Sequence, residues 1–241
     1  MKTLLFFLLS SLKWGKLATT GGTMLLSVAV YAMLWGWRYA AGFVALMFVH
    51  EMGHWVAAYQ RGLKVSAPLF IPFVGASIIL KEHPADVETE AYVASAGPLV
   101  GTAGALGVYL LGRSLDSGLL LAIAYGGLFL NLFNLLPLSP LDGGRITAVI
   151  SPRIWLLGAP IMLALLLYRP SPMLLLIAVL SFPQLIKAWR YDPKAPENLA
   201  YYGVPLQIKL EYGAIYLGLT GLLCVMTFEV HEMLTGMRPA P

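Results

Sequence analysis

The sequence of 241 residues is 59% hydrophobic and only 12% charged, with a mean hydropathy of +0.76. Soluble domains are about 45–50% apolar and about 25% charged, so these values exclude an ordinary soluble protein and indicate an integral membrane protein. Cys224 is the single cysteine, which excludes an internal disulfide and a cysteine-based metal site. The net charge of +4 is small, and its basic residues are scattered between apolar runs. We interpret them as orientation signals, and expect the lipid bilayer and not nucleic acid as a partner.

The first 16 residues combine basic and apolar character. Lys2 and the apolar run 4–9 look like a secretory signal, but Lys13 and Lys16 stand where a small-residue cleavage site should lie. We expect an uncleaved interfacial segment over residues 1–16, with a cleaved signal as the alternative.

The rest of the chain is dominated by apolar runs that approach the roughly 20 residues a helix needs to cross a bilayer. They cover residues 17–37, 39–60, 90–111, 119–136, 154–168, 173–189 and 212–228, with a polar link at 190–211 before the last run. The predicted fold is an all-α polytopic membrane protein with about six to seven transmembrane helices. We divide it into a core at 17–150 and additional C-terminal transmembrane helices at 151–241.

One apolar stretch, PLFIPFVGASIIL at residues 68–80, is too short to cross the membrane as a helix. Its Pro68, Pro72 and Gly75, together with several β-branched residues, favour extended structure over helix. We predict a short membrane-associated β-hairpin here, after the second span, with its backbone groups satisfied by protein or water.

Basic residues predict the orientation of the chain. If the N-terminus lies inside, twelve of the 16 basic residues fall on inner segments. The four remaining basic residues fall outside and are Arg38, Arg113, Arg169 and Arg238. The positive-inside rule therefore favours a multi-pass protein with its N-terminus in the cytoplasm.

The second apolar run contains HEMGH at residues 50–54. On a helix, His50 and His54 project from one face toward one point, and could supply two nitrogen ligands to zinc. Zinc lowers the pKa of a water to near 7, and Glu51 could take the proton of that water as it attacks a carbonyl. The alternative is an incidental polar cluster, although a charge at the bilayer centre costs roughly 2.5–3.5 kcal/mol even on the lenient insertion scale.

A catalytic zinc normally has three protein ligands and one open position. Asp142, in NLFNLLPLSPLDGGR at 131–145, lies at the inner end of the fourth predicted span, on the same side as HEMGH. Proline breaks and Gly143-Gly144 would let this backbone approach closely. The alternative is that Asp142 only forms a β-turn at a helix end. If the inner boundary lies near Arg61, His54 is about 10 Å deep in the membrane at 1.5 Å per residue.

The two motifs in this order resemble the site-2 protease family of intramembrane zinc metalloproteases. The resemblance rests on HEMGH, on the N-x-x-P-x-x-P-L-D-G-G pattern from Asn134 to Gly144, and on Ala96-Gly97-Pro98 at the third span. It covers roughly residues 40–150. Many relatives carry a PDZ or CBS domain, and we expect this chain to be a compact type without either.

The resemblance implies one zinc ion per chain, held by His50, His54 and Asp142, with Glu51 as general base. It also implies that Asn134 orients substrate or stabilises the oxyanion, whereas a plain interhelical hydrogen bond is the alternative. Asn131 is a weaker candidate for that role.

By the same resemblance, the expected activity is hydrolysis of a peptide bond in or near a substrate's transmembrane segment, as in regulated intramembrane proteolysis. Transmembrane proteins are then the expected substrates. The substrate segment would unwind and pair with the 68–80 hairpin as an added strand, at an active site toward the cytoplasmic side.

Two other functions use the same residues. A metal transporter would need no Glu51 and would have a second midplane acidic cluster, which the sequence lacks; a pseudo-protease would only bind membrane partners. His83 and His231, the other histidines, lie in polar surroundings, and we expect both at the surface.

Overall fold

The computed structural model describes residues 2–237, with side chains from residue 18 onward. The described chain is almost entirely helical. Its α-helices are α1 (Lys2–Trp35), α2 (Trp37–Gln60), α3 (Val87–Ser114), α4 (Gly118–Asn134), α5 (Asp142–Thr147), α6 (Trp155–Tyr168), α7 (Pro172–Trp189), α8 (Pro196–Tyr202) and α9 (Leu206–Gly236). A short 3-10 helix, Pro152–Ile154, precedes α6, and two strands, β1 (Leu69–Ile71) and β2 (Gly75–Ser77), lie between α2 and α3.

Each predicted apolar run forms a helix. By length and composition, four of the described helices are long and apolar enough to span a membrane: α1 from Ala18, α3, α7 and α9. The apolar helices α4 and α6 are shorter. α2 is absent from both groups because His50, Glu51 and His54 lower its hydropathy.

The helices α8 and α9 differ from what the sequence indicated. The polar link at 190–211 contains α8, which begins at Pro196, and α9 begins at Leu206 instead of near residue 212. Proline is well suited to the first turn of a helix, because its missing N–H is unpaired there in any case. Asp142, for which a β-turn at a helix end was the alternative to a ligand role, is the first residue of the short helix α5. The interfacial segment expected at 1–16 falls on residues whose side chains lie outside the described part.

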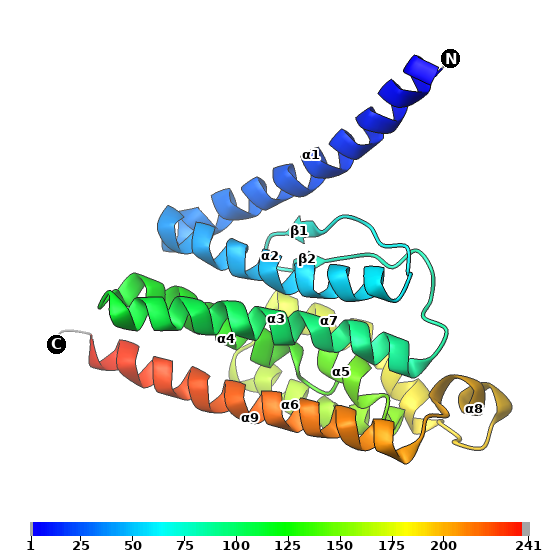
Figure 1. Ribbon diagram of the computed structural model, residues 1–241. Helices are drawn as coiled ribbons and strands as arrows, with labels where there is room; N and C mark the ends of the chain where they lie inside the picture. The colour runs from blue at the N-terminus through cyan, green and yellow to red at the C-terminus, as the bar shows by residue number, and fades with distance from the viewer. Residues whose placement is uncertain (1, 238–241) are drawn as a thin grey trace.

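Helices α2, α3, α4 and α9 pack side by side, while α1 leans away from this group (Figure 1). Small residues allow the close approach of α2 and α3, because a Cβ on Gly53 would lie 2.5 Å from the carbonyl oxygen of Ala96. The main core lies between α3, α4 and α9, where Ala105, Leu128 and Leu223 are fully buried. α8 lies beyond the N-terminal end of α9, far from the C-terminus of the chain (Figure 1).

The predicted hairpin is present. β1 and β2 are antiparallel, with Leu69 opposite Ser77 and Ile71 opposite Gly75. Phe70 is buried against Phe48 of α2. On the other side of the hairpin, the Phe73 N–H donates a hydrogen bond to the hydroxyl oxygen of Tyr31 in α1 at 3.0 Å. The hairpin is therefore fixed between α1 and α2, above the centre of α2.

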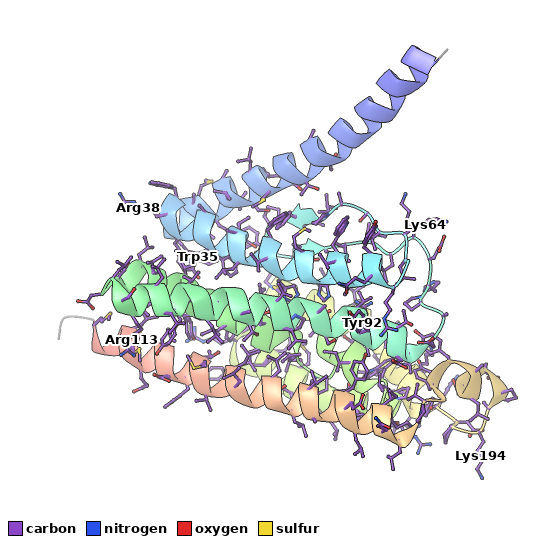
Figure 2. All side chains as sticks on the ribbon, viewed as in Figure 1. Trp35, Arg38, Lys64, Tyr92, Arg113 and Lys194 are labelled. Atoms are coloured by element: carbon purple, nitrogen blue, oxygen red, sulfur yellow. The ribbon has the colours of Figure 1, made fainter. Side chains whose placement is uncertain are left out.

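Charged side chains separate to the two ends of the helices. Figure 2 shows Arg38 and Arg113 at one end, and Lys64 and Lys194 at the other. This is the separation that the predicted antiparallel order of spans requires, since the sequence placed the first pair on one side of the membrane and the second pair on the opposite side.

Candidate metal centre

Two histidines of α2 face the same point inside the protein. His50 and His54 are 3% and 5% exposed, and their Nε2 atoms lie 3.1 Å apart. They share one helix face because residues four apart are separated by about one turn. The predicted pair is thus brought together, as the helical spacing required.

Asp142 completes a group of three, 88 residues after His54 in the chain. Its Oδ2 lies 3.3 Å from Nε2 of His50 and 3.2 Å from Nε2 of His54, and the residue is 7% exposed. The close packing of the following glycines makes this approach possible. A Cβ on Gly143 would lie 2.1 Å from the carbonyl oxygen of Leu135, and one on Gly144 would lie 2.2 Å from the nitrogen of Ser139.

The three donor atoms form a nearly equilateral triangle with sides of 3.1, 3.2 and 3.3 Å. Ligands at 2.0–2.1 Å from a tetrahedral zinc ion are separated by about 3.3–3.4 Å, from the tetrahedral angle alone. The observed triangle therefore has the size of one face of a zinc coordination tetrahedron. It leaves the fourth position of such a tetrahedron free of protein ligands from this group.

Hydrogen bonds at Nδ1 fix both imidazole rings in the tautomer whose Nε2 can bind a metal. The carbonyl oxygen of Val93 can only accept, so Nδ1 of His54, at 2.8 Å, must donate to it. Nδ2 of Asn131 donates to the carbonyl of Gly127 at 2.7 Å, which directs its Oδ1 toward Nδ1 of His50 at 2.8 Å. Each ring thus carries a proton on Nδ1, and both Nε2 lone pairs face the Asp142 carboxylate. Three electron-rich atoms at this spacing fit a cation between them.

The two candidate asparagines differ in position. Asn131 is 1% exposed and holds His50, whereas Asn134 lines the adjoining cavity and has no side-chain hydrogen bond within the described part of the chain. Sequence reasoning ranked Asn131 as a weaker version of Asn134 and missed its contact with His50. The sequence feature that could have indicated this contact is the Asn131 amide inside an otherwise apolar helix, because a buried amide requires a hydrogen-bond partner.

Glu51 lies beside the metal group without belonging to it. It is 6% exposed and lines the cavity together with residues 74–78 of the hairpin. The group of converging donors consists of His50, His54 and Asp142 alone among the described residues. Glu51 is therefore placed to act on a molecule in the cavity.

The cavity has a volume of about 350 Å³ and opens between four parts of the fold. α2 supplies His50, Glu51 and His54, and the end of α4 supplies Asn134. Residues 74–78 of the hairpin form one wall, and Leu176 and Leu180 of α7 form another. An extended peptide in this space would lie between the hairpin and α7.

The free edge of β2 faces this cavity. The N–H of Phe70 donates to Thr23 of α1, away from β2, so Phe70 and Ala76 form a non-hydrogen-bonded pair of the ladder. By the alternation of a strand, the N–H of Ala76 points to the edge opposite β1. In the described part of the chain no strand pairs with that edge.

The segment Ala96-Gly97-Pro98 of α3 lies beside the metal group, and Gly97 makes this close approach possible. A Cβ at Gly97 would lie 2.2 Å from Nε2 of His54. A glycine is thus needed for α3 to pass directly over the metal group. The remaining histidines, His83 and His231, are exposed, as expected, and stand outside the group.

Comparison with known proteins supports the same region. The sequence model of peptidase family M50 matches residues 38–118. A zinc metalloprotease of Methanocaldococcus jannaschii is 30% identical over 130 residues, which are 52% of this chain and 37% of that protein. Rip3 of Mycobacterium tuberculosis, also named as a zinc metalloprotease, is 33% identical over 143 residues, covering 55% of this chain and 36% of Rip3. The chain thus spans little more than a third of these relatives.

Proposed function

We propose that the chain is a zinc-dependent intramembrane endopeptidase of peptidase family M50, the site-2 protease family, whose sequence model matches residues 38–118. It would hydrolyse a peptide bond in or near a transmembrane segment of a substrate protein. The observation that carries the proposal is the triangle of His50, His54 and Asp142, with Glu51 beside it at the wall of the same cavity.

In this proposal His50, His54 and Asp142 hold one zinc ion. When bound, zinc acts as a Lewis acid toward water and the scissile carbonyl. Val93 and Asn131 keep the two rings oriented by accepting their Nδ1 protons in hydrogen bonds. Such outer partners fix the ring orientation and raise the basicity of the ligand.

Glu51 would be the general base and acid. Its carboxylate accepts a proton from the water whose oxygen adds to the carbonyl carbon, and returns a proton to the amide nitrogen as the C–N bond breaks. Asn134 lines the same cavity with a free amide, and would donate a hydrogen bond to the carbonyl oxygen as negative charge develops there.

The hairpin would hold the substrate in an extended form. A helical peptide bond is shielded by its own hydrogen bonds, so the helix must open before attack. Pairing with the free N–H and C=O groups of β2 would replace these bonds without reading side chains. Ala76 directs its N–H to that edge, and Glu51 lines the same cavity.

We also propose the membrane arrangement that the sequence predicts. Six to seven of the helices cross the bilayer, with the core at 17–150, further spans at 151–241, and residues 1–16 at the interface. The end that carries Lys64 and Lys194 faces the cytoplasm, in keeping with the positive-inside rule (Figure 2). His54 lies seven residues from Arg61, so the site is about 10 Å inside the bilayer on that side.

The test is cleavage of a generic single-span protein by purified chain in lipid vesicles. Wild type should contain about one zinc per chain and cleave the substrate. Glu51→Gln should keep the zinc and lose cleavage, because it retains the shape but cannot accept a proton. Glu232→Gln, on the exposed face of α9, is the matched control and should cleave normally. Undiminished cleavage by Glu51→Gln would overturn the role of Glu51, and metal flux without cleavage would indicate a transporter.

A further inference from the structure

Arg145 lies one helical turn after Asp142 on α5, at the edge of the cavity. Its Nη1 is 3.9 Å from Oδ1 of Asp142, whereas Oδ2 of the same carboxylate faces the two histidines. The two oxygens of Asp142 therefore have different partners. The guanidinium attracts one oxygen, and the other remains directed at the metal group.

Arg145 is itself held from a second side. Its Nε donates to Oε1 of Glu90, on the first turn of α3, at 3.1 Å. The Arg145 and Glu90 side chains are only 23% and 26% exposed, so this pair is screened less than an ion pair at the surface. Because Glu90 balances the charge of Arg145, the guanidinium can stay beside Asp142 without adding net positive charge next to a bound cation.

A third residue fixes Glu90. The Tyr201 hydroxyl, from α8 in the polar link, donates to Oε2 of Glu90 at 2.6 Å. Burial and the neighbouring Glu90 carboxylate raise the pKa of Tyr201, so this hydroxyl keeps its proton and remains a donor. Both oxygens of Glu90 thus have a donor, one from α5 and one from α8.

We propose that Arg145 is a positioning residue of the metal centre, and that Glu90 and Tyr201 hold it in place. This inference rests on the proposed zinc site. Arg145 keeps Asp142 turned so that Oδ2 alone points at the metal. The unit Tyr201–Glu90–Arg145–Asp142 connects α8 and α3 to the first residue of α5. The C-terminal part of the chain thereby contributes to the zinc site without supplying a ligand.

The first measurement is zinc affinity, by competition with a chromophoric chelator, on the purified metal-depleted chain in detergent. Arg145→Gln and Glu90→Gln should bind zinc about 10–100-fold more weakly, the usual cost of losing an outer partner of a ligand. Tyr201→Phe should lose less affinity in the same direction. The double variant Arg145→Gln/Glu90→Gln should bind as weakly as Arg145→Gln alone, because the two residues act as one unit.

Tyr109→Phe is the matched control. The Tyr109 hydroxyl donates to Glu229 at 3.2 Å and accepts a hydrogen bond from Nη1 of Arg113 at 3.2 Å. The same three residue types therefore also meet, with different connections, at the opposite end of the helices, where Figure 2 shows Arg113. Its removal should leave zinc affinity unchanged. The visible spectrum of the Co²⁺-substituted protein is the second readout, since it reports the ligand geometry, and it should change in Arg145→Gln but not in Tyr109→Phe.

The outcomes separate this inference from the proposed function. If wild type binds no zinc, the proposed function fails. If wild type binds zinc, and Arg145→Gln binds it equally tightly with an unchanged Co²⁺ spectrum, the positioning role is overturned. Should Arg145→Gln not fold, Tyr201→Phe decides in its place: weaker zinc binding than Tyr109→Phe supports the unit, and equal binding contradicts it.

Discussion

Gly97 lies so close to His54 that a Cβ at this position would be 2.2 Å from the Nε2 atom of His54. Helix α3 thus passes over the metal group at a distance that only glycine permits. His54 cannot move aside freely, because the Val93 carbonyl holds its other nitrogen and the residue is buried.

Gly97→Ala should therefore displace the His54 ring. Zinc affinity should fall at least as far as it does on loss of an outer partner, about 10–100-fold. The control is Gly107→Ala on the same helix, where a Cβ would meet nothing within 4 Å. That change should keep zinc affinity and stabilise the helix by up to about 1 kcal/mol. Equal zinc affinity in the two variants would contradict the described packing.

Asn131→Ala should weaken zinc binding by about 10–100-fold, because His50 loses the acceptor that fixes its tautomer and ring orientation. The check is a zinc titration of the metal-depleted chain. The Gly127 carbonyl also loses its side-chain donor, so a lower melting temperature should accompany the change. Wild-type zinc affinity in Asn131→Ala would mean that His50 needs no such support.

Asn134→Ala, in contrast to Asn131→Ala, should slow cleavage without weakening zinc binding. It lines the cavity, and its side chain has no hydrogen bond to the metal group among the described residues, so zinc content and melting temperature should stay at wild-type values. The rate of cleavage should fall by about 10²–10³, the usual loss for one oxyanion donor. Single-turnover cleavage of a single-span substrate measures this. A normal rate would reduce Asn134 to a structural residue.

Ala76→Pro tests the free edge of β2. The N–H of Ala76 points away from β1, so proline removes a donor from the free edge and leaves the β1–β2 hydrogen bonds in place. Cleavage of the single-span substrate should fall while zinc affinity remains unchanged. Ala76→Ser keeps the N–H and is the control. Full activity of the proline variant would exclude strand pairing at this position.

The sequence predicted the membrane class, the helical runs, the hairpin and the three residues that converge. These features depend on composition, on local periodicity and on one motif with fixed helical spacing, all of which act over short stretches of chain. The role of Asp142 could be predicted because a catalytic zinc requires a third protein ligand and the glycines after Asp142 allow a close approach.

The contacts around this group were not predictable in the same way. Asn131 meets His50 across 81 residues, and Tyr201 meets Glu90 across 111 residues. Such pairs depend on how helices rotate and slide against one another, and no local pattern records that. α8 was missed because seven residues in a polar link show too little periodicity, and the short helix α5 that begins at Asp142 was missed for the same reason.

The central claim is that His50, His54 and Asp142 bind one zinc ion, and zinc X-ray absorption of the purified chain tests it most directly. Wild type should show two imidazole nitrogens and a carboxylate oxygen at about 2.0–2.2 Å from the metal. Asp142→Ala should bind zinc far more weakly and lose the carboxylate from the spectrum. An Asp142→Ala protein that binds one zinc as tightly as wild type, with the same spectrum, would contradict the account.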